Sequence, residues 1–134
     1  MKTELFYLLL TALLTGVLWI PVVIGYVKTR GPLTEESYRT PPTSELPDWV
    51  KRANRAHVNA VENFGPFAAV VLTAQIVGVS TPATVTCAEI YFFARLAHAL
   101  VHISGFGKFK TRTVLFTIGW VAFVWYAVAV LMRG

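Results

Sequence analysis

Long apolar stretches are the feature that most constrains how this chain can fold. The first, residues 5–27, contains no charged residue. About 20 apolar residues in a helix cross the roughly 30 Å hydrocarbon core of a bilayer. Further candidate helices cover residues 49–79, 83–104 and 112–132. We therefore predict an all-α integral membrane protein, a single four-helix bundle over residues 1–134, with a kink at Pro21 in its first helix.

The second of these ranges, residues 49–79, is uneven in polarity along its length. Residues 51–63 are polar and residues 64–79 are apolar. The apolar part alone covers only about 24 Å at 1.5 Å per residue. Its polar turns must either project from the membrane or be shielded by other helices. We expect Asp48 to be the N-cap of this helix, and the proline-rich residues 28–48 to form a loop.

Composition narrows the class of protein. Charged residues make up 14% of the chain and hydrophobic residues 55%, whereas an average soluble domain has about 25% charged residues. This balance excludes a soluble enzyme and a disordered chain. A single cysteine excludes a disulfide framework and a cysteine-cluster metal site, and we expect no metal.

Basic residues are distributed unevenly between the connections. The net charge of +5 is attributed to basic loops of a membrane protein rather than to nucleic-acid binding. By the positive-inside rule, the first and third loops are cytoplasmic and both termini lie outside. Short loops and the lack of an organelle signal favour a bacterial inner membrane. The basic residues of these two connections are Lys28, Arg30, Arg39, Lys51, Arg52, Arg55, Lys108, Lys110 and Arg112.

Polar residues recur at helical spacing inside the predicted spans. On the second helix the steps of three and four place one stripe on a single face. A second stripe follows the third helix, and we expect an ion pair between Glu62 and Arg95 to join the two helices. His57 and Asn63 are expected to point elsewhere. The stripes comprise Arg52, Arg55, Asn59, Glu62 and Pro66 on the second helix, and Tyr91, Arg95, His98 and His102 on the third.

Arginines outnumber the acids that could neutralise them in this region. Arg52, Arg55 and Arg112 remain once Glu62 is assigned to Arg95. A surplus of guanidinium groups predicts an anionic ligand, because arginine binds carboxylates through a planar two-point fork. The alternatives are polar contacts that only join helices, and arginines that extend to the membrane surface. A haem or quinone carrier is a further alternative, but its haem ligands would have to include His57, which lies off the stripe.

Several segments resemble a known family of membrane proteins. Residues 52–67, RANRAHVNAVENFGPF, resemble the second-helix signature of the MAPEG family, the membrane-associated proteins in eicosanoid and glutathione metabolism. Residues 94–98, ARLAH, resemble its third-helix signature, and residues 110–113, KTRT, its basic turn into the fourth helix. Together with the length and the long first loop, these segments make the whole chain similar to a bacterial-type member.

The resemblance implies a homotrimer that binds glutathione between neighbouring subunits near the cytoplasmic side. It also implies transferase- or peroxidase-type chemistry on small apolar electrophiles that enter from the lipid bilayer, with no nucleic-acid partner. Arg112 would stabilise the glutathione thiolate, and Thr113 would lie beside it. Lys28 or Arg30 would match a basic residue at the end of the first helix. The remaining glutathione-binding residues would be Arg55, Asn59, Glu62, Arg95, His98 and His102.

Two positions differ from the catalytic members that the chain resembles. Those members commonly carry a tyrosine where this chain has His102, and another where it has Phe116. A non-enzymatic membrane scaffold or a lipid-binding protein of the same fold therefore stays as an alternative to the enzyme.

Overall fold

Helices form almost all of this protein. The computed structural model describes residues 1–133, and in that range every regular element is helical. Three helical stretches are long and apolar enough to cross a membrane, namely Thr3–Arg30, Pro82–Ser104 and Lys108–Leu131. The helices are α1 (Thr3–Val17), α2 (Trp19–Arg30), α3 (Glu35–Arg39), α4 (Asp48–Ile76), α5 (Pro82–Ser104), the short 3-10 helix η1 (Lys108–Lys110) and α6 (Thr111–Leu131).

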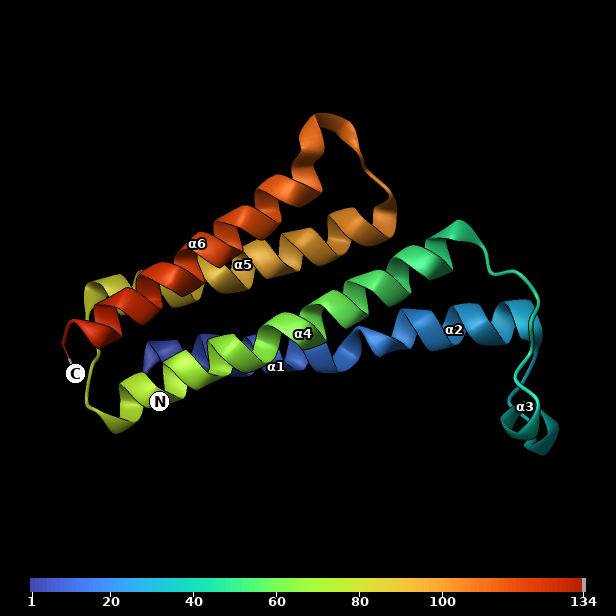
Figure 1. Ribbon diagram of the computed structural model, residues 1–134, viewed down its shortest axis with the longest axis horizontal. Coiled ribbons are helices and arrows are strands. Elements are labelled where there is room, and N and C mark those ends of the chain that lie inside the picture. The colour runs from blue at the N-terminus through green and yellow to red at the C-terminus, as the bar shows by residue number, and fades with distance from the viewer. Residues whose placement is uncertain (134) are drawn as a thin grey trace.

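The first apolar stretch is a broken helix. α1 ends at Val17 and α2 begins at Trp19, with Leu18 between them. Pro21 has no N–H to donate to the carbonyl of Val17, and its ring crowds that carbonyl. The break therefore lies one turn before Pro21, the residue at which the sequence predicts a kink. α2 nevertheless continues the direction of α1, so the two form one long rod (Figure 1).

The connection between α2 and α4 is more ordered than a simple loop. The sequence predicts no helix here, but α3 forms over Glu35–Arg39 because Thr34 and Ser37 cap each other's backbone N–H groups. Arg30 donates hydrogen bonds to the carbonyl and hydroxyl oxygens of Ser44. Glu45 accepts a hydrogen bond from Lys51, which lowers the pKa of the Glu45 carboxyl below its ordinary value.

α4 is the longest helix, with 29 residues. It begins at Asp48, so Pro47 is the N-cap and the prediction that Asp48 caps the helix is wrong. The helix includes Pro66, which has no N–H for the carbonyl of Glu62 one turn earlier. Gly25 of α2 lies so close to α4 that an added Cβ would be 2.5 Å from a methyl carbon of Val50.

The core lies between α4, α5 and α6. The rings of Phe67 and Tyr91 are stacked with their centroids 3.8 Å apart, and Tyr126 meets Phe67 edge-on at 6.5 Å. Small side chains such as Ala88 and Ala122 fill the remaining buried positions and let the helices approach closely.

The two ends of the molecule differ. Both termini and the turn between α4 and α5 lie at one end, whereas the α3 segment and the turn between α5 and α6 lie at the other (Figure 1). α5 begins with Pro82 after a capping box made by Thr81 and Thr84. These two connections, together with the helix ends that flank them, carry most of the basic residues, which therefore share one end of the molecule.

Candidate functional site

A hydrogen bond between Arg95 and Asn59 joins α5 to α4 at the centre of the predicted site. Nη2 of Arg95 donates to Oδ1 of Asn59 at 2.5 Å, and the arginine is only 5% exposed. The predicted Glu62–Arg95 ion pair is not formed: within residues 1–133 the ion pairs are Arg39–Glu35 and Lys51–Glu45, and Glu62 is exposed. The amide oxygen of Asn59 accepts from one nitrogen of the guanidinium without the cost of desolvating a carboxylate.

His98 and His102 lie one turn apart on α5 and face each other. Their rings meet edge-to-face with centroids 5.5 Å apart, and both residues are buried. Within the described chain, Nδ1 of His98 and both ring nitrogens of His102 are buried without a hydrogen-bond partner. Unpaired buried polar atoms cost free energy. These nitrogens therefore offer hydrogen bonds to a bound polar molecule.

Arginines surround the two histidines. The charges of Arg112, Arg55, Arg52 and Arg95 all act on His102, and those of Arg95 and Arg112 also act on His98. Arg55 and Arg112 are exposed. None of the four forms an ion pair with a carboxylate in residues 1–133. The cluster therefore has an excess of positive charge.

Arg52 also has a structural role that the sequence did not reveal. Its Nε donates a hydrogen bond to the carbonyl of Ile103 at 3.1 Å, in the last turn of α5. Its guanidinium lies against Gly105, where an added Cβ would come within 2.9 Å of the arginine Cζ. A cation is favourable at the C-terminal end of a helix, so this contact fixes the start of α4 against the end of α5.

The other predicted residues lie around this cluster. Thr113 is exposed at the start of α6, and its carbonyl accepts a hydrogen bond from Thr117 at 2.9 Å. Phe116, one turn deeper, lies 6.2 Å from the His98 ring and 5.9 Å from the Arg95 guanidinium. Arg95, His98 and His102 are thus buried and Asn59 is half-buried against Arg95, while Arg55, Glu62, Arg112 and Thr113 are exposed.

Asn63, which was expected to point away from the polar stripe, contacts α5 through its backbone, and its side chain donates to the Asn59 carbonyl on its own helix at 2.8 Å. Its carbonyl accepts a hydrogen bond from the Tyr91 hydroxyl at 3.0 Å, and it lines a cavity together with Arg95. The spacing of polar residues along α4 did not predict this contact, because the hydroxyl that donates belongs to Tyr91 of α5. The nearby Pro66 is the available signal, since backbone near a proline in a membrane helix often takes hydrogen bonds from neighbouring helices.

A second buried polar group was missed altogether. Glu4 is 1% exposed and accepts hydrogen bonds from Ser80 at 2.7 Å and Thr84 at 2.9 Å. It precedes the apolar residues 5–27 and belongs to neither polar stripe, so no pattern in the sequence pointed to it. Its hydrogen bonds join α1 to α5 and to the turn before it. Glu4 lies at the end of the molecule opposite the α5–α6 turn (Figure 1), so it takes no part in the site.

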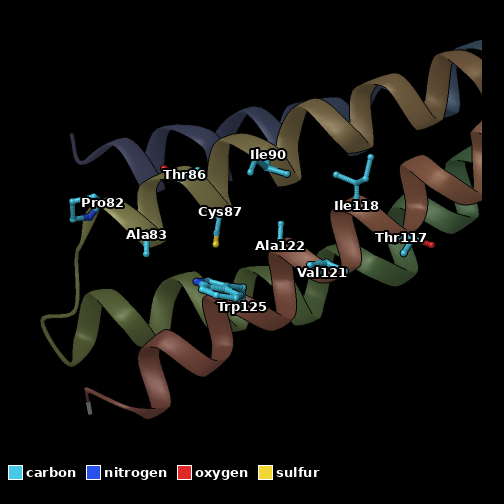
Figure 2. Close-up of a pocket in the computed structure, with 10 residues that line it drawn as sticks. All are labelled: Pro82, Ala83, Thr86, Cys87, Ile90, Thr117, Ile118, Val121, Ala122 and Trp125. Atoms are coloured by element: carbon cyan, nitrogen blue, oxygen red, sulfur yellow. The ribbon is translucent and has the colours of Figure 1, made fainter.

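A groove between α5 and α6 has a different character. It has a volume of about 600 Å³, and the side chains of Cys87 and Trp125 border it (Figure 2). Its other lining residues, which include Ile90, Ile118 and Val121, are mostly apolar. None of the predicted site residues lines it, so this groove is separate from the arginine–histidine cluster.

Comparison with known proteins agrees with the helical architecture and the polar motif. The family model described as the MAPEG family matches residues 5–132. A comparison with curated proteins gives no match. The family match includes all the helices that carry the arginine–histidine cluster, and we conclude that this chain belongs to the MAPEG family.

Proposed function

We propose that this protein binds glutathione and catalyses transferase- or peroxidase-type reactions between glutathione and small apolar electrophiles. The observation that carries the proposal is the arginine–histidine cluster, which has no paired carboxylate in the described chain. Membership of a family that includes glutathione-related transferases supports the identity of the ligand.

The charges of the site complement those of glutathione, which carries two carboxylates and one ammonium group. In this proposal Arg55 and Arg95 attract the carboxylates, with Asn59 orienting Arg95. Glu62 binds the ammonium group. The unpartnered nitrogens of His98 and His102 supply further hydrogen bonds.

Arg112 is the proposed catalytic residue, with Thr113 beside it. A free thiol has a pKa near 8.5, so little thiolate is present at neutral pH. A guanidinium group close to the sulfur favours the thiolate and lowers the pKa of the thiol. The thiolate is the nucleophile that would attack an electrophile arriving from the lipid.

A neighbouring copy of the chain would complete the site. Glu62 is exposed at the middle of the 29-residue α4, yet a charge near the centre of a bilayer costs about 2.5–3.5 kcal/mol even on lenient scales. We therefore propose that this face of α4 packs against another copy in a homotrimer. Glutathione would then bind between subunits.

The proposed arrangement in the membrane has four spans. α4 would be the fourth, since 29 residues reach about 43 Å at 1.5 Å per residue and exceed the hydrocarbon core. Its polar first turns would project beyond the core. The basic α2–α4 and α5–α6 connections share one end of the molecule (Figure 1), which we propose to be cytoplasmic. A bacterial inner membrane is the proposed location.

A non-enzymatic scaffold or lipid-binding protein is the second candidate. Phe116 and His102 favour it, because neither side chain offers a hydroxyl group at the centre of the cluster. In that case the arginines would bind lipid head groups without turnover. Glutathione binding and the ionisation of the bound sulfur together separate the two candidates, so the test measures both.

Arg112→Ala tests the catalytic assignment. We expect the bound glutathione of the wild-type protein to show the ultraviolet absorbance of a thiolate at pH 7, and the variant to lose most of it. Affinity for S-methylglutathione, which cannot ionise at sulfur, should be nearly unchanged. Arg39→Ala, in the exposed α3, is the matched control. Equal thiolate absorbance in wild type and Arg112→Ala would contradict the role of Arg112, and absence of glutathione binding would favour the scaffold.

A further inference from the structure

Glu89 is the one acidic residue of α5, a helix long and apolar enough to cross a membrane. It follows Pro82, the first residue of the helix, by seven positions, which is about 10 Å along the axis at 1.5 Å per residue. An ionisable side chain at that depth of a membrane helix is costly, and such residues are candidates for function. The proposed glutathione site does not use Glu89, so its place in α5 needs a separate explanation.

No group of the described chain neutralises this carboxylate. Within residues 1–133, the carboxylates that accept side-chain hydrogen bonds or form ion pairs are those of Glu4, Glu35 and Glu45. Arg95 follows Glu89 by six residues, which places it on a different face of the helix, and it donates to Asn59 instead. The Glu89 carboxylate is therefore available to a cation from outside the chain.

Glu89 lines a cavity between α1, α5 and α6, called here the Glu89 cavity. Its volume is about 490 Å³, and Glu89 is its one charged lining residue. Tyr7 and Phe93 also line it, and their rings meet edge-on with centroids 6.0 Å apart. A carboxylate attracts an ammonium group by charge and hydrogen bonding, and aromatic rings attract cations as well. The polar end of this cavity therefore suits a single positive charge.

The Glu89 cavity adjoins the apolar groove between α5 and α6. Ile90 and Ile118 line both of them. The groove extends from these two residues past Cys87 to Trp125 (Figure 2), and its volume is about 600 Å³. An elongated apolar group attached to the cation could therefore lie along the groove while the charge stays at Glu89.

We propose that Glu89 binds a lipophilic amine in its protonated form, with the ammonium group on the carboxylate and the apolar body in the α5–α6 groove. A neutral ligand would leave a carboxylate in apolar surroundings without a partner, and an anion would be repelled. A phospholipid with an ammonium head group fits less well, because its phosphate would have to enter a cavity lined mostly by apolar side chains. The ligand would enter from the bilayer.

The test measures binding of three matched probes by ¹⁹F NMR to the full-length protein in phosphatidylcholine nanodiscs at pH 7, without glutathione. The probes are 4-(4-fluorophenyl)butylamine, the corresponding alcohol, which is neutral, and the corresponding butanoate, which is an anion. An aliphatic amine with a pKa near that of lysine, about 10.4, is protonated at this pH. We expect saturable binding of the amine, about tenfold tighter than that of the alcohol, as a charge-assisted hydrogen bond implies.

Two variants locate the charge that gives this preference. Glu89→Gln keeps the size of the side chain and removes its charge, so the amine should bind no more tightly than the alcohol. Glu36→Gln makes the same change on the exposed surface of α3 and should keep the preference of wild type. A preference for the amine that persists in Glu89→Gln, or equal affinities for amine and alcohol in wild type, would overturn the proposal.

A third variant locates the apolar body and does not depend on Glu89. Ile118 is 43% exposed and lines both the Glu89 cavity and the groove, so Ile118→Trp should obstruct them without disturbing the core. We expect it to weaken binding of amine and alcohol alike. Unchanged affinities in Ile118→Trp would overturn the proposal. So would the absence of saturable amine binding to wild type, the result expected if a neighbouring copy of the chain covers the groove.

Discussion

Asn59 on α4 accepts a hydrogen bond from Arg95 on α5, and this amide takes the place that a carboxylate was expected to occupy. The contact is 2.5 Å long, and the arginine is almost wholly buried. It fixes the relative position of the two helices that carry most of the candidate site. It also leaves Glu62 available for other interactions, since the Glu62 side chain is exposed.

Replacing Asn59 tests the energetic weight of this contact. Asn59→Ala removes the acceptor and leaves Nη2 as well as Nη1 of Arg95 buried without a partner. We expect a loss of about 1.5–3 kcal/mol in the free energy of unfolding, measured by denaturant titration in detergent. Asn54→Ala, at an exposed position of the same helix, is the control and should change stability little. Equal stability of the two variants would contradict the assigned contact.

The contact of Gly105 with Arg52 gives a second prediction. Gly105 has φ +78°, and a Cβ there would meet the Arg52 guanidinium at 2.9 Å. Gly105→Ala should therefore cost about 1–2 kcal/mol in backbone strain alone and displace Arg52. Gly107→Ala is the control, because Gly107 has φ −115° and no atom within 4 Å of an added Cβ. Hydrogen exchange at the end of α5 should rise only in Gly105→Ala; a similar rise in both variants would refute the contact.

Glu4 should matter for stability although it lies far from the site. Glu4→Ala removes the acceptor for the hydroxyl groups of Ser80 and Thr84 and leaves buried Thr84 without it. We expect a loss of about 2 kcal/mol or more in the free energy of unfolding. Glu36→Ala, on the exposed surface of α3, should leave stability within about 0.5 kcal/mol of wild type. A stable Glu4→Ala variant would show that the buried carboxylate is not needed to join α1 and α5.

Glu62 offers a test of binding that is separate from folding. Because Glu62 is exposed and outside any ion pair of the described chain, Glu62→Gln should leave the thermal midpoint nearly unchanged. If Glu62 binds the ammonium group of glutathione, wild type should bind glutathione more tightly than N-acetylglutathione, which lacks that charge. The variant should lose this preference. An unchanged preference would remove Glu62 from the proposed site.

Hydrophobicity and helical periodicity predicted most of the fold. Runs of apolar residues located the long helices, and the missing N–H of Pro21 located the break between α1 and α2. Short-range capping was less visible: α3 depends on the reciprocal bonds of Thr34 and Ser37, which a stretch rich in proline concealed. Local pattern predicts an element well when its stabilisation is local or repeats along the helix.

The contacts between helices were harder to predict. The stripes on α4 and α5 correctly predicted that Asn59 lies near Arg95 and His98 near His102. Glu62, however, was predicted as the partner of Arg95 only because its charge is opposite. The side chain that reaches Arg95 depends on the rotation and depth of each helix, which spacing within one helix does not specify. The hydrogen bonds that Asn63 and Glu4 accept were missed for the same reason, because their donors lie on α5 or in the turn that precedes it.

The proposed function depends on glutathione binding at the arginine–histidine cluster, which isothermal titration calorimetry of the detergent-purified protein measures. Arg55→Ala is the informative variant, because Arg55 is exposed and its charge acts on His102. Arg39→Ala is the control. We predict saturable glutathione binding to wild type and Arg39→Ala. Arg55→Ala should bind glutathione about tenfold more weakly, as expected for loss of a charge-assisted hydrogen bond. No binding to a well-folded wild-type protein, or equal affinity in all three proteins, would contradict it.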